Sequence, residues 1–226
     1  MSGRLTRATR LTLRAAARLA GGCMLLGVSC FPHGPIPARE LYRLSLPEPA
    51  ASDSAPLTAT DGSTAPLTGT LAIAEYATPG IYGDPSIVYR LNETEYGSYP
   101  DREWAVPLGE QLGVLTERVL ARVPVTDAPA VFDPPSRRAQ TYIWRATVRE
   151  FDEVDVGSEV HAAVQVDLRI VRAQDDSILW SGSSRLERVA DSPRMPGIVQ
   201  TLSALADEVV TDLATRARRE LSTRRP

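Results

Sequence analysis

Apolar residues recur along this chain with two different periods, and these periods predict where strands and helices lie. The clearest case is residues 158–172, where apolar side chains from Val160 to Ile170 alternate with polar ones. Such alternation is typical of a strand with one face in the core and the other in water. Shorter runs of β-type residues predict further strands at 39–46, 69–75, 86–91, 95–99, 141–151 and 177–187.

Two segments show the helical period instead. Residues 107–122 and 197–219 carry apolar side chains at spacings of three and four, so each is expected to form a helix with one apolar stripe. Pro107 suits the first turn of the earlier helix. Strands with one apolar face and helices with one apolar stripe predict an α+β fold, in which a mainly antiparallel sheet carries both helices on one face.

Polar or proline-rich segments separate the predicted elements. Residues 92–94 are expected to form a hairpin turn, the acidic residues 152–157 a second turn, and residues 133–135 a third. Residues 47–68 are rich in Pro, Ala, Ser and Thr, which predicts a loop without a function of its own. The folded domain is expected to span residues 39–221.

The first 29 residues have the layout of a secretory signal. Five arginines and no acidic residue precede and flank an apolar stretch, 19–28, that is too short to cross a bilayer. The stretch ends at Cys30, and the sequence before it resembles a bacterial lipobox. Cys23 lies inside the apolar run, so Cys30 is the expected site of lipidation, followed by a tether at 30–38. An ordinary signal with a cysteine at the junction is the alternative.

Lipidation at Cys30 would place a diacylglycerol on the sulfur and an acyl group such as palmitate on the new amino terminus. More than one chain gives stable membrane anchoring, which a single chain does not. With Cys30 used in this way, the mature chain has no second cysteine with which to form a disulfide. Its fold must rest on the core alone.

Removal of the signal also changes the charge. The 25 basic residues are all arginine, and losing five of them leaves 20 against 28 acidic residues, a formal charge of −8. Proteins that bind nucleic acid through its phosphates need a basic surface, so this composition argues against a nucleic-acid partner. A hydrophobic share of 43% with 23% charged residues is typical of a globular domain.

The sequence contains little that predicts catalysis. His161 lies on the polar face of its strand, where it could act as a base, but no sequence motif supplies a nucleophile. Asp152, Glu153 and Asp155 could attract calcium, yet they lack the glycine and terminal glutamate of a known calcium loop. We therefore expect no catalytic residues, no metal and no cofactor. Paired carboxylates of a glycosidase remain open, because their spacing is spatial.

Residues 82–104 form the most aromatic segment of the chain, with five of its thirteen aromatic residues. Tyr, Trp and Arg are favoured where proteins meet, so this segment is the candidate recognition surface. The alternative is that several of these residues belong to the core or to turns. The candidate partner-binding residues are Tyr82, Pro85, Tyr89, Arg90, Tyr99, Arg102 and Trp104.

The same segment resembles the ABC-type transport auxiliary lipoproteins, a family that includes the paraquat-inducible lipoproteins of Gram-negative bacteria. The similar features are Pro85 after an aromatic residue, the run from Ile87 to Arg90, a polar hairpin, and Trp104 before Pro107. The resemblance covers about residues 40–220. It implies a periplasmic, non-catalytic subunit of a lipid-transport system that pairs an ABC transporter with a mammalian-cell-entry (MCE) protein.

The resemblance further implies a position on the periplasmic face of the outer membrane, with MCE and ABC components as partners and a homo-oligomer as a further option. Two other functions stay open. The chain could be an envelope-assembly lipoprotein that binds cell-wall or outer-membrane proteins, or a periplasmic hydrolase that uses His161.

Overall fold

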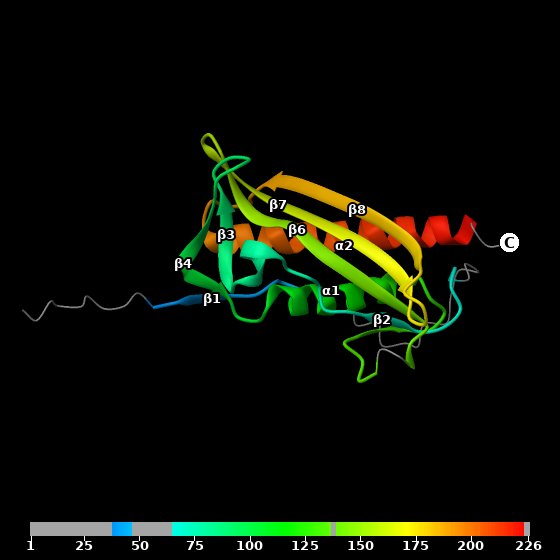
Figure 1. The fold of residues 1–226 in the computed structure, drawn as a ribbon. Helices are drawn as coiled ribbons and strands as arrows, with labels where there is room; N and C mark the ends of the chain where they lie inside the picture. Colours follow the sequence, from blue (N-terminus) through cyan, green and yellow to red (C-terminus); the bar gives the residue numbers. More distant parts are fainter. Residues whose placement is uncertain (1–37, 47–64, 137–138, 224–226) are drawn as a thin grey trace, which may run out of the picture. The chain divides into compact units, whose positions relative to one another are not determined.

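The computed structural model describes residues 38–46, 65–136 and 139–223. All of them belong to one compact unit, Pro37–Pro226. Cys30, the signal and residues 47–64 of the predicted loop lie outside the described residues. Within this unit an eight-stranded sheet packs against two long helices (Figure 1).

Three long strands form the frame of the sheet. β6 (Tyr142–Val156), β7 (Glu159–Arg172) and β8 (Ile178–Val189) pair in antiparallel order. Gly157, at a φ of 63°, allows the tight turn between β6 and β7. The alternation predicted for residues 158–172 is confirmed, since the buried residues of β7 include Ala162, Val164 and Val166 at every second position.

The short strands join the edge of β6 at its two ends. β2 (Leu71–Ile73) runs parallel to the start of β6, and β5 (Ala130–Phe132) runs parallel to β2. β3 (Ser86–Arg90) runs parallel to the end of β6. β4 (Tyr96–Trp104) pairs antiparallel with β3 and parallel with β1 (Glu40–Tyr42).

The sheet is therefore mixed, and four of its seven strand pairings are parallel. The expected α+β class is present, but the expectation of a mainly antiparallel sheet is not confirmed. Alternation shows which face of a strand is buried; it does not show which neighbour the strand pairs with. Here β2 and β3 are connected to β6 through loops and a helix rather than through tight hairpins, so they pair with it in parallel.

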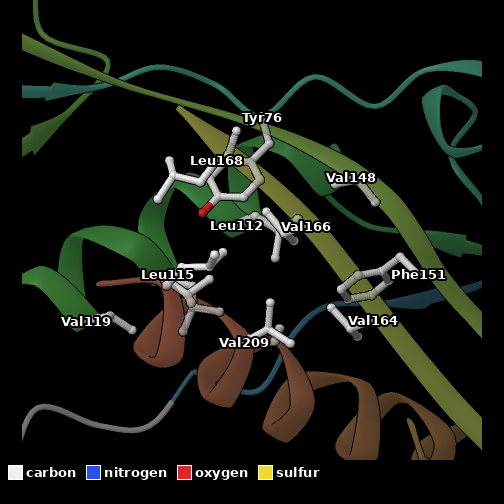
Figure 2. Packing of buried hydrophobic residues seen from close by; sticks show 14 of the residues in the cluster. Tyr76, Leu112, Leu115, Val119, Val148, Phe151, Val164, Val166, Leu168 and Val209 are labelled. Carbon is white, nitrogen blue, oxygen red and sulfur yellow. The ribbon is translucent and has the colours of Figure 1, made fainter. Parts of the chain in front are cut away.

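Both long helices lie on the same face of the sheet, as expected. α1 (Leu108–Arg122) follows Pro107, and α2 (Met195–Thr223) closes the chain. Figure 2 shows side chains from α1, α2, β6 and β7 meeting in the core between them, among them Leu115, Val209, Phe151 and Val166. None of the helices in the described residues combines the length and apolarity of a membrane span.

A bulge in β6 decides which side chains face this core. Val148 pairs with Val166 and Glu150 with Gln165, so β6 has one extra residue, Arg149, at this point. The extra residue shifts the alternation by one position. Phe151 therefore faces the helices, and Glu150 faces the opposite side, which neither α1 nor α2 covers; we call it the open face.

Several element boundaries differ from the expectations. Strand 95–99 extends to Trp104, the first predicted strand is reduced to Glu40–Tyr42, and β5 was not predicted. The largest error concerns residues 152–157, which were expected to form an acidic turn. Residues 152–156 continue β6, and the turn begins only at Gly157.

Candidate functional site

The predicted recognition segment lies at one end of the sheet, where the β3–β4 hairpin meets the last third of β6. The hairpin turn at residues 92–94 is confirmed: Leu91 N–H donates to the Glu95 carbonyl at 2.9 Å, and the Asn92 side chain accepts from Thr94 N–H at 3.0 Å. β3 and β6 pair so that Val88 neighbours Asp152 and Tyr89 neighbours Glu153. Adjacent residues of β6 therefore face opposite sides of the sheet.

A chain of charged side chains occupies the open face at this end. Asp152 is fully buried, and Tyr82 in the short 3-10 helix η1 (Gly80–Gly83) donates its hydroxyl to Asp152 Oδ1 at 3.1 Å. Arg90 Nε lies 2.9 Å from Asp152 Oδ2, an ion pair without hydrogen-bond alignment. Arg90 Nη2 contacts Glu150 Oε2 at 3.3 Å, and Arg185 Nε contacts the same oxygen at 2.9 Å. The chain thus runs from η1 to β8.

Burial dominates the protonation of this group. Loss of hydration raises the pKa of Asp152 to about 6, although the neighbouring Arg90 charge and the Tyr82 hydroxyl act in the opposite direction. The pKa of Tyr82 is also raised, first by burial and then by the Asp152 carboxylate. The carboxylate and the phenol therefore hold each other in a fixed hydrogen bond that is not free for a ligand.

A second polar group lies on the helix side of the same strands. Tyr89 and Tyr99 pack with ring centroids 5.0 Å apart, and the Arg102 guanidinium lies 4.4 Å from the Tyr99 centroid. Tyr99 donates its hydroxyl to Glu153 Oε2 at 2.9 Å. Gly97 makes this packing possible, because a Cβ there would lie 2.3 Å from the Tyr89 ring.

Trp104 and Pro85 have different roles. Trp104 is buried in the main core, where its ring packs edge-on against Phe151 at 5.7 Å. Its backbone N–H donates to the Pro85 carbonyl at 2.7 Å, while the Pro85 ring is exposed. Trp104 therefore belongs to the core.

The structure brings the seven candidate residues to one end of the sheet but divides them between its two faces. Tyr82, Tyr89 and Tyr99 are half-buried, and Arg90 is buried. The most exposed aromatic residue of the segment is Tyr96, at 41% exposure, which was not among the seven. Its position opposite Arg90, across the hairpin, marks it as an open-face residue.

Sequence reasoning also missed the two carboxylates that organise this end. Asp152 and Glu153 are 0% and 5% exposed, where a solvated turn was expected. One sequence signal indicated that they belong to a strand: Val154 follows them and continues the strand pattern. Burial also raises the pKa of Glu153.

His161, the candidate base, lies on β7 beside carboxylates. Its Nδ1 is 3.3 Å from Glu187 Oε1, and its Nε2 is 3.5 Å from Glu159 Oε2. These contacts provide no hydroxyl or thiol that the imidazole could activate. Within the described residues no three His, Cys, Asp or Glu side chains gather in a way that could hold a metal ion.

Comparison with known proteins gives a family and a fold. The sequence matches the family described as "ABC-type transport auxiliary lipoprotein component" over residues 46–214. A crystal structure of a protein from Xanthomonas campestris, of the family DUF330, is similar at a TM-score of 0.64 and 16% identity, over 80% of this chain and 95% of that one. A crystal structure described only as an uncharacterized protein is similar at a TM-score of 0.59 and 14% identity, over 79% and 98%. No curated protein matches the chain.

Proposed function

This chain belongs to the family of ABC-type transport auxiliary lipoprotein components, and from that premise we propose a specific role for it. It is a non-catalytic subunit of an ABC/MCE-type lipid transport system that works between the inner and outer membranes. Cys30 anchors it to the periplasmic face of the outer membrane of a Gram-negative bacterium. The family match over residues 46–214 is the observation that carries the proposal.

The docking end, defined here as Pro85, Tyr96 and Arg102, is the surface that would contact the MCE partner. These three side chains are exposed or partly exposed, although Tyr96 lies beside the Arg90 guanidinium and Arg102 beside the Tyr99 ring. Tyrosine and arginine are enriched at protein interfaces because each combines apolar area with a polar group. The ordered networks beneath hold the hairpin in one conformation, which lowers the entropy cost of binding.

The side-chain chemistry of the described residues supports a binding role. His161 faces two carboxylates, and the buried carboxylates Asp152 and Glu153 each accept a tyrosine hydroxyl. Replacing His161 with Ala should therefore leave transport unchanged. A hydrolase that used His161 as its base would lose its activity.

Site-specific photocrosslinking in the living cell tests the partner. A benzoylphenylalanine at Tyr96 keeps the first aromatic ring of the native residue and extends its benzoyl group into solvent, and the same residue at exposed Gln174, in the β7–β8 turn, is the matched control. We expect the MCE protein to crosslink from position 96 and not from position 174. Crosslinks from position 96 to cell-wall or outer-membrane proteins alone would instead support the envelope-assembly function.

The anchor has its own test. Cys30→Ala should abolish incorporation of labelled palmitate and remove the protein from the outer-membrane fraction, because the residue that carries the acyl chains is gone. Cys23→Ala is the control, and it should leave both properties unchanged. Palmitate labelling that survives Cys30→Ala would refute the assignment.

A further inference from the structure

We propose that the open face of the sheet carries a binding site for a phosphate-bearing anion, centred on Arg145 and Arg169. These two arginines stand directly opposite each other on β6 and β7, and both are exposed. Like charges at directly opposite positions of paired strands destabilise the sheet. An anion bound between the two guanidinium groups would remove that repulsion.

An open groove of about 790 Å³ surrounds the arginine pair. The side chains around it are small: Ser181 and Ser183 on β8, Thr147 on β6, and Ala74 after β2. They leave space above the two guanidinium groups. They also add the hydroxyl groups of Ser181 and Thr147, which can donate to a bound oxyanion, while the Ser183 hydroxyl bonds to Asp167.

The charged side chains of the groove are three arginines and three carboxylates, but they are not all paired with one another. Arg145 Nη2 contacts Asp176 Oδ1 at 2.7 Å, and Arg149 Nε contacts Asp167 Oδ2 at 2.6 Å. Arg169 forms no ion pair within the described part of the chain. Burial raises the pKa of Asp167, but hydrogen bonds from Arg149 and Ser183 and the charge of Arg149 lower it overall, and the charge of Arg169 makes only the smallest of these contributions.

Glu75 also borders the groove, but its carboxylate lies against Gly109 at the start of α1. Of the three guanidinium groups in the groove, Arg169 is therefore the one without an ion pair within the described part of the chain.

This arrangement selects phosphate over smaller anions. A guanidinium is a planar fork that matches two oxygens of one anion, and a phosphate offers enough oxygens for more than one fork. A carboxylate has two oxygens, which a single fork already occupies. The phosphate could be free in solution or part of a lipid headgroup, because both present the same oxygens. The site does not depend on the proposed transport function.

Equilibrium dialysis with labelled inorganic phosphate tests the site on the full-length lipoprotein in a nonionic detergent. We expect saturable binding that weakens about ten-fold in Arg169→Gln and in Arg145→Gln, because each loses a charge-assisted fork. Arg188→Gln is the matched control: Arg188 is as exposed as Arg145 and pairs with Glu208 outside the groove. It should bind as the wild type does.

Stability separates a binding role from a structural one. Arg169→Gln removes the like-charge contact, so its unfolding temperature without phosphate should equal or exceed that of the wild type. Competition by dihexanoyl phosphatidylglycerol at lower concentrations than phosphate would identify a headgroup as the ligand, and weaker competition would identify free phosphate. The proposal is overturned if the wild type shows no saturable binding, or if Arg169→Gln binds phosphate as tightly as Arg188→Gln does.

Discussion

The two faces of the sheet bury charge in different ways, and Asp152 and Glu153 show the difference within one pair of neighbours. Glu153 faces the helix side, where it accepts a hydroxyl from Tyr99 beside the stacked rings. Asp152 faces the open side, which neither long helix covers, and it is still completely buried. Its cover consists of other side chains, chiefly Arg90 and Tyr82.

This difference separates the sources of stability from the sources of specificity. The helix face contains the main core, whose apolar burial drives folding. The open face gains less apolar burial, because the smaller of the two apolar clusters in the described residues lies there and consists of Ala72, Ala74, Ile143 and Val171, with Ala173 packed against them. Its charges must therefore be satisfied by one another, and those that remain, above all Arg169, are available for a ligand.

Truncation of one apolar residue on each face should produce the largest difference in the free energy of unfolding between two variants. Leu202 on α2 is 0% exposed, and Leu202→Ala should lower the free energy of unfolding by about 2–5 kcal/mol through lost transfer energy and a cavity. Val189 on β8 is 49% exposed, and Val189→Ala should change the free energy of unfolding by no more than about 0.5 kcal/mol. Urea unfolding measures both. Equal losses would contradict the division between the faces.

The pH dependence of stability should reveal Asp152. Its pKa is raised from 3.8 to about 6 by burial, so between these pH values the folded state keeps a proton that the unfolded state releases. This group therefore contributes stability below pH 3.8, and that contribution is lost as the pH rises through 6. The loss is about 3 kcal/mol, at roughly 1.4 kcal/mol for each pKa unit.

Asp152→Asn should remove this part of the pH dependence, because the amide does not titrate. The stability of the variant relative to the wild type should rise by about 3 kcal/mol between pH 3 and pH 8, whatever constant offset the lost contact with Arg90 introduces. Chemical unfolding at several pH values measures the difference. Asp176→Asn, on an exposed turn, is the control. Parallel curves for Asp152→Asn and the wild type would show that Asp152 ionises in the fold as it does in water.

Much of the fold could be predicted from the sequence because periodicity reports burial directly. The strand at 158–172 and both helices follow from it, since each has one apolar face that must be covered. The pairing of the short strands could not be predicted. Residues 71–73 read as a strand, but only the tertiary structure places them parallel to β6 and next to β5.

For the candidate site, the sequence predicted the aromatic segment but not the residues that this segment contacts. The aromatic segment does lie at one end of the sheet, but its tyrosines bind buried carboxylates that the sequence pattern assigned to a turn. Runs of acidic residues are ordinarily solvated, so the acidic run at Asp152 and Glu153 outweighed the strand pattern that continues to Val154. The Arg145–Arg169 pair was missed for a related reason: it depends on the register between β6 and β7.

Removal of single tyrosine hydroxyls should give the smallest effects, graded by the burial of the acceptor. Tyr82→Phe and Tyr99→Phe each deprive a buried carboxylate of a donor, and each should cost about 1 kcal/mol of the free energy of unfolding. Tyr42 donates to Glu40, whose side chain is 59% exposed and can bind water instead, so Tyr42→Phe should cost close to nothing. Urea unfolding at pH 8, where Asp152 is ionised, gives the comparison. A loss in Tyr42→Phe as large as in the other two would mean that burial of the acceptor does not set the strength of these bonds.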